Sequence, residues 1–383
     1  MKNLLTVREY EKISADDCPH FDELIKFAAA SEFLDLNWRY VQAKNFVGVI
    51  RLPGGFQIEI LPKLDGDEKL LRSLVVKMLR TLKNFSGKTF RNAQLDTSRL
   101  PLYEIFIRQY LDMVSELVKR GLKSSYVGRE ENLRVFKGKL LIGRHVRTNF
   151  AHREKFFVAF DEYGLNRPEN RLIKSTLGKI LRTTADRENF RLATRLLADF
   201  DSVDASTNFA KDFAAVAIDR LNRAYEAVMQ WTKIFLAGKN FTAFAGKSQA
   251  QALLFPMEKL FESFVTHHVK KFFADSFTVT AQAGGKFLFD VSKACKLRPD
   301  ILLEGDETII MDAKWKCDVP EADMYQMFAY SKRYGAAKIF LPVPPTVDEI
   351  CYRAADFNVT IFPVDPFDMT ASLKTLRRKL YLP

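Results

Sequence analysis

Two short apolar runs that end in charged residues constrain the fold of this chain more than any other feature. Residues 301–303 and 309–311 have the length and composition of buried strands, and a glycine–aspartate turn between them predicts a hairpin. Asp300 precedes the first run, and Asp312 and Lys314 follow the second. Because residues i and i+2 of a strand share a face, we expect the side chains of Asp312 and Lys314 to point the same way. Asp300, at the end of the other strand of the hairpin, can lie across from Asp312.

Two carboxylates and an ammonium group at one edge of an apolar sheet suit the metal-dependent hydrolysis of a phosphodiester. Carboxylates supply the hard oxygen ligands that Mg²⁺ prefers, with Mn²⁺ as the alternative ion. We therefore expect Asp300 and Asp312 to bind the metal and Lys314 to orient the attacking water. The alternative is a surface hairpin with an ordinary Asp–Lys pair, worth ~0–1 kcal/mol.

The R-P-D tripeptide that ends at Asp300 and the D-A-K tripeptide 312–314 resemble the PD-(D/E)XK nuclease signature. Eleven residues separate the two aspartates, and Asp312 stands where a glutamate is commoner. The resemblance implies a restriction-endonuclease-like α/β domain, Mg²⁺ dependence and cleavage of DNA.

Two helices that flank this signature carry further candidates. In the helix that begins near residue 257, the family pattern selects Glu262 as a third metal ligand, whereas the helical wheel places Glu258 closer to the apolar face. After the signature, Gln326 and Tyr330 are four residues apart and so share one helix face, where they could contact the metal ligands or the scissile phosphate. For Tyr330 a core aromatic is the alternative.

Four further segments, in the correct order, resemble the McrC family. They are I-E-I-L-P-K-L at 58–64, K-G-K-L at 137–140, F-D at 160–161 and N-R-L-I-K-S-T-L at 170–177. McrC is the nuclease subunit of modification-dependent McrBC restriction systems. The resemblance implies a GTP-hydrolysing AAA+ partner of the McrB type that recognises modified DNA, and docking of the N-terminal part of this chain on that partner, which stimulates hydrolysis.

The positive charge of the chain is concentrated in one segment. The net charge is +12, and residues 119–155 carry 11 basic and 3 acidic side chains, whereas residues 246–383 are nearly neutral. Alternating apolar residues around Gly138 predict a short hairpin there. We expect this segment to contact double-stranded DNA or an acidic partner surface, with a solvated basic face as the alternative. The predicted DNA contacts are Arg134, Lys137, Lys139, Arg144 and Arg147, together with Arg298 beside the nuclease signature.

A chain of 383 residues is expected to form two or three domains. The patterns predict an α+β or α/β protein with a β-rich N-terminal, partner-docking domain (1–100), a mainly helical middle region with the basic hairpin (101–245) and the nuclease domain (246–383). Helices are predicted over 66–84, 101–120, 167–183, 189–200, 210–236 and 256–273. Trp38, Trp231 and Trp315 are interpreted as packing residues.

Several classes of function are disfavoured. No apolar run is long enough to span a membrane, no signal peptide is recognisable, and the four scattered cysteines fit a reduced, cytoplasmic protein. The G-K-S sequence at 246–248 lacks the first glycine of a phosphate-binding loop, since Phe241 occupies that position. We therefore expect the chain to bind no nucleotide itself.

The function predicted from these observations is that of an Mg²⁺-dependent DNA endonuclease subunit of a McrBC-like antiviral restriction complex, which cleaves methylated DNA together with its AAA+ partner. Two alternatives remain at this point. One is a non-catalytic adaptor that activates a motor NTPase, and the other is the nuclease subunit of a different anti-phage restriction system.

Overall fold

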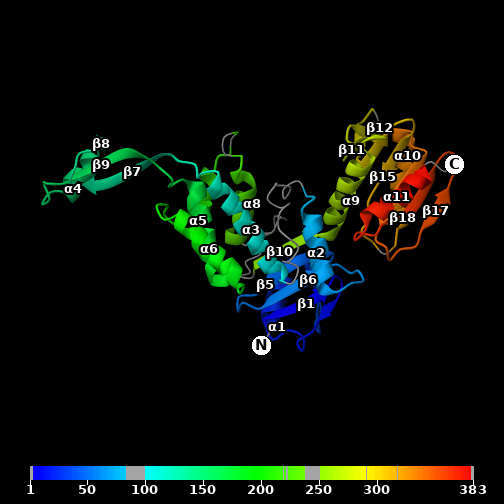
Figure 1. Ribbon diagram of the computed structural model, residues 1–383, viewed down its shortest axis with the longest axis horizontal. Coiled ribbons are helices and arrows are strands. Elements are labelled where there is room, and N and C mark those ends of the chain that lie inside the picture. Colours follow the sequence, from blue (N-terminus) through cyan, green and yellow to red (C-terminus); the bar gives the residue numbers. More distant parts are fainter. Residues whose placement is uncertain are drawn as a thin grey trace. The chain divides into compact units, whose positions relative to one another are not determined.

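The computed structural model describes residues 3–82, 100–218, 220, 223–237, 251–289, 291–316 and 318–380. The chain divides into two compact units, of which the first combines Met1–Leu102 with Phe244–Pro383 and the second is Tyr103–Ala243 (Figure 1). The described residues contain eleven helices and five sheets, which confirms a mixed α+β class. Residues 245–248 and Cys317 lie outside the described residues.

A four-stranded sheet forms the first part of unit 1. Its strand order is β1 (Leu4–Arg8), β6 (Gln57–Leu61), β5 (Phe46–Arg51) and β10 (Gln251–Pro256), with β1 parallel to β6 and the other pairs antiparallel. Strands β5 and β6 flank the turn at 53–55 and pair as a hairpin, which fits the predicted β-rich character of this region. The edge strand β10 is distant in sequence from the other three strands, and it continues directly into the next helix, α9 (Met257–Phe273).

Gly48 permits this distant pairing. Its φ angle is +137°, and a Cβ atom added to it would lie 1.9 Å from the backbone oxygen of Leu253 in β10. No other residue could occupy this position without displacing one of the two strands.

A second small sheet and two helices complete the N-terminal lobe. The sheet has the order β2 (Lys12–Ile13), β4 (Val41–Ala43) and β3 (Leu34–Leu36), and the helices are α1 (Phe21–Ala29) and α2 (Glu68–Leu79). The Asp67 carboxylate caps α2 by accepting from the Leu70 N–H. The interpretation of Trp38 as a packing residue is wrong, because this side chain lies in the turn between β3 and β4 and is 79% exposed.

A six-stranded mixed sheet forms the C-terminal part of unit 1. Its order is β11 (Thr278–Ala281), β14 (Ile301–Glu304), β15 (Thr308–Met311), β16 (Lys338–Val343), β18 (Asn358–Pro363) and β17 (Ile350–Arg353). Strands β15, β16 and β18 are parallel, and the other neighbours are antiparallel. β12 (Lys286–Phe289) and β13 (Ala294–Leu297) form a separate two-stranded ribbon.

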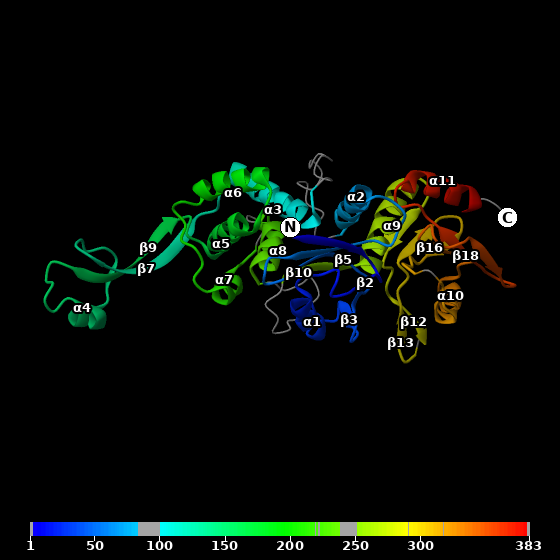
Figure 2. The same cartoon turned by 90° about the horizontal axis from the view of Figure 1, so that it is seen from below.

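Helices cover both faces of this sheet (Figure 2). On one face, Met327 and Tyr330 of α10 (Glu321–Tyr334) pack in one core with Ile310 and Ile339. Helix α9 and the C-terminal helix α11 (Met369–Leu380) lie together on the other face. The alternation of side chains along the strands supplies an apolar surface to each layer.

Unit 2 contains the predicted middle helices. They are α3 (Leu102–Lys119, whose first residue belongs to unit 1), α5 (Pro168–Thr183), α6 (Arg187–Asp199), α7 (Phe209–Ala215) and α8 (Tyr225–Ala237). The prediction of one helix over 210–236 is wrong, because α7 ends at Ala215 and the next residue, Val216, is extended. The Asp212 carboxylate binds the Arg171 guanidinium at 2.6 Å, and this contact fixes α7 against α5. Among the described residues, no helix is long and apolar enough to span a membrane.

The basic segment forms a long two-stranded arm within unit 2 (Figure 1). Strands β7 (Ser125–Leu133) and β9 (Phe156–Gly164) pair antiparallel along their full length, and the short β8 (Lys139–Leu140) and helix α4 (Ile142–Thr148) lie at the end of the arm. The predicted local hairpin is wrong, since β8 pairs with β9 and not with residues 133–135. Gly138 allows this pairing, because a Cβ atom there would lie 2.4 Å from the Ala159 carbonyl oxygen.

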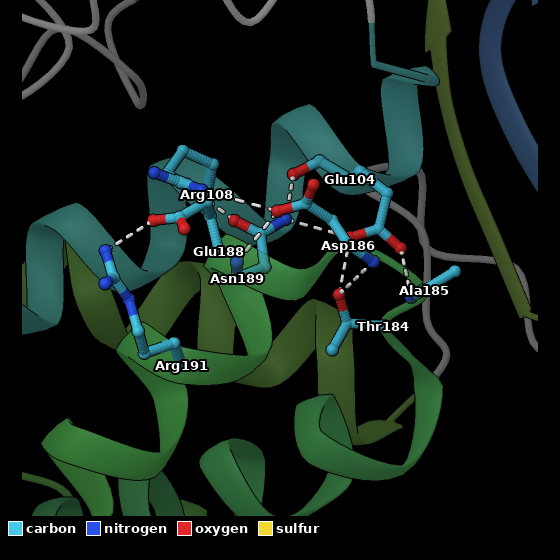
Figure 3. A network of polar contacts seen from close by, with 8 residues as sticks. All are labelled: Glu104, Arg108, Thr184, Ala185, Asp186, Glu188, Asn189 and Arg191. Atoms are coloured by element: carbon cyan, nitrogen blue, oxygen red, sulfur yellow. Dashed lines mark hydrogen bonds and ion pairs between the residues drawn. The ribbon is translucent and has the colours of Figure 1, made fainter.

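A buried polar network joins α3 to the α5–α6 connection (Figure 3). The Glu104 carboxylate accepts from the Thr184 hydroxyl (2.6 Å), the Ala185 N–H (2.8 Å) and the Asn189 amide (2.8 Å). The Arg108 guanidinium donates to the Asn189 side-chain oxygen at 2.6 Å. Every member therefore has a partner, as a buried polar cluster requires.

Candidate active site

The candidate site lies where β14 begins and β15 ends. Ile301 pairs with Met311, which places Asp300 and Asp312 opposite one another just beyond the paired residues, as predicted. One Asp300 oxygen accepts from the Ala313 N–H at 2.9 Å, and the other accepts from the Gln282 amide at 3.0 Å. The hairpin therefore fixes the orientation of the Asp300 carboxylate.

Lys314 connects the strand to helix α10. Its Nζ atom lies 2.7 Å from Asp312 Oδ2 and 3.7 Å from Asp323 Oδ1, and it donates to Gln326 Oε1 at 3.3 Å. The Gln326 amide donates in turn to the Tyr330 hydroxyl at 2.8 Å. The structure thus brings together the predicted residues Asp312, Lys314, Gln326 and Tyr330, and it adds Asp323, for which the sequence pattern gave no signal.

Helix α9 contributes Glu262 to this site and directs Glu258 elsewhere. The Gln282 amide donates to Glu262 Oε1 as well as to Asp300, so that it bridges the two carboxylates. Glu258 instead lines a separate cavity of about 410 Å³ with Trp315 and Lys316. Between the two glutamates weighed from the sequence, Glu262 is the one at the site.

Gln282 is a site residue that sequence reasoning missed. It follows β11 and adopts a φ angle of +52°, which is uncommon for a residue with a side chain. Its backbone N–H donates to the Asp300 carbonyl oxygen at 2.7 Å, so both its main chain and its side chain are bound to Asp300. A single glutamine at a strand end carries no recognisable pattern.

Burial of the site carboxylates, more than their closeness to one another, disfavours their ionisation. Burial, followed by the neighbouring charges of Asp312 and Glu262, raises the pKa of Asp300 to about 8. Burial also raises the pKa of Asp312 and of Glu262. Burial alone would lower the pKa of Lys314, but the surrounding aspartates raise it, so the ammonium form is retained.

The chemistry of this donor set fits a hard divalent cation. Three carboxylates share one partly buried site, and burial raises the pKa of each of them. As they stand, the described residues include no group of three or more His, Cys, Asp or Glu side chains arranged to hold an ion. Two of the carboxylates accept instead from the Gln282 amide, and Asp312 pairs with Lys314.

Trp315 packs behind the site, as the sequence predicted. Its ring contacts Phe261 at a centroid distance of 5.0 Å, and its indole N–H donates to both oxygens of Glu9, at 3.3 and 3.2 Å. Glu9 is 2% exposed, and its pKa is raised to about 7 by burial. The N-terminal lobe therefore contacts the residue that directly follows Lys314.

The predicted DNA-contacting cations fall in two places. Arg298 is exposed beside Asp300, whereas the others, Arg134, Lys137, Lys139, Arg144 and Arg147, are exposed around the end of the arm in unit 2. Apolar side chains are exposed among them, including Ile142 (69%) and Phe150 (86%). The end of the arm therefore combines positive charge with uncovered apolar surface.

A mixed sheet between helices, with aspartates and a lysine converging at two strand ends, places the chain in the broad α+β class of proteins with a buried acidic–lysine site. Comparison of the sequence with known families is more specific. The profile of the McrBC 5-methylcytosine restriction system component matches residues 41–343, and the chain belongs to this family. No curated protein matches the chain.

Two solved structures from Thermococcus gammatolerans are similar in fold. A chain of the refined half-complex of McrB AAA+ hexamers with bound McrC is 20% identical, with 98% of this chain and 99% of that chain covered and a TM-score of 0.70. A chain of the cryo-EM structure of the McrBC complex is 21% identical, with coverage of 71% and 87% and a TM-score of 0.51.

Proposed function

We propose that this restriction-system component is an Mg²⁺-dependent endodeoxyribonuclease, with Mn²⁺ as the alternative metal, that acts on methylated DNA in the cytoplasm. The proposal rests on the convergence of Asp300, Asp312 and Lys314 at the paired ends of β14 and β15. Membership of a 5-methylcytosine restriction family supports DNA as the substrate.

Each residue of the site has a role that follows from its contacts. Asp300, Asp312 and Glu262 would hold the metal, which when bound polarises a phosphoryl oxygen and lowers the pKa of a coordinated water. Lys314 orients the attacking water and offsets negative charge on the phosphoryl group. Gln326 binds both Lys314 and the Tyr330 hydroxyl, and this contact holds the lysine in place.

An alanine variant of Asp312 tests the nuclease assignment. With the AAA+ partner and methylated DNA present, Asp312→Ala should abolish cleavage while partner binding and stimulation of nucleotide hydrolysis persist. Glu304→Ala is the matched control, because Glu304 is an exposed carboxylate at the other end of β14. Retention of cleavage by Asp312→Ala would refute the assignment.

We also propose that the chain acts with an AAA+ GTPase of the McrB type and binds no nucleotide itself. The similar Thermococcus gammatolerans structure, an assembly of McrB AAA+ hexamers with bound McrC, supports such a partner. Residues 1–100 are the proposed docking domain. Stimulation of GTP hydrolysis by the purified chain tests this, and stimulation without any metal-dependent cleavage would favour the adaptor function instead.

The arm has two candidate partners, duplex DNA and the AAA+ subunit, and a separate observation supports each of them. The five exposed cations fit the phosphates of duplex DNA, whereas the uncovered Ile142 and Phe150 are typical of a protein-binding surface. Replacement of Arg134, Lys137 and Lys139 by alanine should flatten the salt dependence of DNA binding if DNA is the partner. Loss of hydrolysis stimulation in Ile142→Ser/Phe150→Ser, with DNA binding unchanged, would identify the AAA+ subunit.

A further inference from the structure

The ribbon formed by β12 and β13 is the feature of unit 1 that the proposed roles do not use. In the part of the chain that the structure describes, it pairs with no strand of the six-stranded sheet, and it projects beyond that sheet (Figure 2). Its second strand ends at Leu297, and only Arg298 and Pro299 separate that strand from Asp300. The ribbon is therefore joined to Asp300, a candidate metal ligand, by a connection of two residues.

The end of the ribbon exposes apolar side chains on both of its faces. Leu288 is 37% exposed, Phe289 is 55% exposed and Val291 is 102% exposed. Because neighbouring residues of a strand point to opposite faces, exposure of both Leu288 and Phe289 means that neither face is covered there. Solvation alone does not account for three large apolar side chains at one tip.

Positive charge accompanies this apolar tip. Lys293 and Lys296 of the ribbon and Arg298 just after it are all exposed. Lys293, just before β13, and Cys295, within it, have φ angles of +46° and +53°, in the left-handed region. Such backbone is uncommon away from glycine and is found preferentially at functional sites.

The base of the ribbon is fixed to helix α10. The Lys286 ammonium donates to the Arg333 carbonyl oxygen at 3.0 Å and lies 4.5 Å from the centre of the Tyr334 ring. The Tyr334 hydroxyl donates to the Ala283 carbonyl oxygen at 3.1 Å. Helix α10 also supplies Gln326, which accepts a hydrogen bond from Lys314. The ribbon is therefore anchored to the helix that orients the Lys314 side chain.

We propose that the β12–β13 ribbon binds double-stranded DNA beside the cleavage site. Lys293, Lys296 and Arg298 contact phosphates, and Phe289 and Val291 enter a groove, where apolar side chains contact sugars and base edges. The cations and the connection to Asp300 favour DNA as the occupant over an uncharged protein surface. This proposal rests on the proposed nuclease function, because the role of the ribbon is to position the duplex at the cleavage site.

Binding to a duplex oligonucleotide tests the proposal separately from cleavage. In the full chain with Asp312→Ala, which cannot cut, Phe289→Ser/Val291→Ser should weaken binding about tenfold and leave its salt dependence unchanged. Lys293→Ala/Lys296→Ala should reduce the slope of log K against log salt by about 1–2, since each lost phosphate contact removes about 0.9. Circular dichroism and thermal unfolding show whether each variant is folded.

Matched controls come from β17, an edge strand of the six-stranded sheet, and from the C-terminal helix α11. Ile350→Ser/Tyr352→Ser removes exposed apolar side chains from β17, and Lys374→Ala/Arg377→Ala removes exposed cations from α11. These variants should bind DNA like the parent. If they weaken binding as much as the ribbon variants do, the ribbon has no special role and the inference is wrong.

Failure of the inference differs from failure of the nuclease assignment. Suppose that the chain with Asp312 intact cuts DNA, that the ribbon substitutions made in that chain leave cutting unchanged, and that the same substitutions in Asp312→Ala leave binding unchanged. The ribbon proposal is then overturned while the nuclease function stands. If the variants retain DNA binding but no longer bind the AAA+ partner, the ribbon is a protein contact and the proposal is equally wrong. If the intact chain never cuts, the ribbon is judged from the dissociation constants alone.

Discussion

The buried carboxyl group of Glu9 should make the stability of the protein fall as the pH rises. Glu9 lies in the N-terminal lobe, where it accepts hydrogen bonds from the Trp315 indole and the Lys63 N–H. Burial raises its pKa from the ordinary value of 4.5 to about 7. The protonated form therefore favours folding, and its contribution is complete below about pH 4.5 and is lost as the pH rises through about 7.

The size of the effect follows from the two pKa values. At 1.36 kcal/mol per pKa unit, a pKa near 7 in the folded chain and 4.5 in the unfolded chain corresponds to ~3 kcal/mol as an upper limit. Glu9→Gln keeps an acceptor oxygen for Trp315 but cannot ionise. The free energy of unfolding of this variant, relative to that of the natural protein, should therefore improve by ~2–3 kcal/mol between pH 4.5 and pH 8.

Urea unfolding of the full chain at several pH values, followed by tryptophan fluorescence, measures this difference. The other titrating groups are common to both proteins and cancel in the comparison. Glu32→Gln, which removes an exposed carboxylate from the same lobe, is the control for the loss of one negative charge. A difference for Glu9→Gln that is the same at pH 5 and pH 8 would refute the reasoning.

Three further predictions concern the scaffold. Glu59→Ala should destabilise the chain by about 3–5 kcal/mol in urea unfolding, because Glu59 is fully buried and its removal leaves the buried Arg72 guanidinium, 2.6 Å away, without this partner. Gly48→Ala should prevent the pairing of β5 with β10, so we expect little soluble protein on expression and protease sensitivity of what remains. Tyr110→Phe should cost about 1–2 kcal/mol in thermal unfolding, since it removes the buried 3.0 Å hydrogen bond with the Thr232 hydroxyl; unchanged stability would mean that this bond contributes nothing.

The parts of the fold that could be predicted are those whose determinants are local. Helix α9 follows from the helical spacing of its apolar residues, and the hairpin of β14 and β15 follows from two short apolar runs joined by a tight turn. The same geometry placed Asp300 opposite Asp312 and Lys314 beside it. The choice between Glu262 and Glu258 depends on how α9 packs against the rest of unit 1. A helical wheel does not give this information, because it does not say which face of the helix lies toward the site.

What could not be predicted depends on contacts between distant segments. Strand β8 pairs with β9 and not with residues 133–135, because Leu133 already belongs to the long ladder between β7 and β9. Trp38 was misjudged because composition says that tryptophan is usually buried, whereas here it lies in a turn with the Arg39 guanidinium 3.9 Å above its ring. Gln282 gave no signal because its role arises from a single side chain that reaches two carboxylates from different elements.

The late position of strand β10 in the sequence affects how the protein folds during synthesis and how fragments of it can be prepared. During synthesis, the whole of unit 2 leaves the ribosome before residues 251–256 are available to complete the N-terminal sheet. Until then, the polar backbone edge of β5 lacks its partner, and a nascent chain must keep it from other strands. A fragment that stops before residue 251 retains this open edge permanently, so a stable N-terminal lobe has to be prepared with its late strand restored, for example by a short linker in place of unit 2.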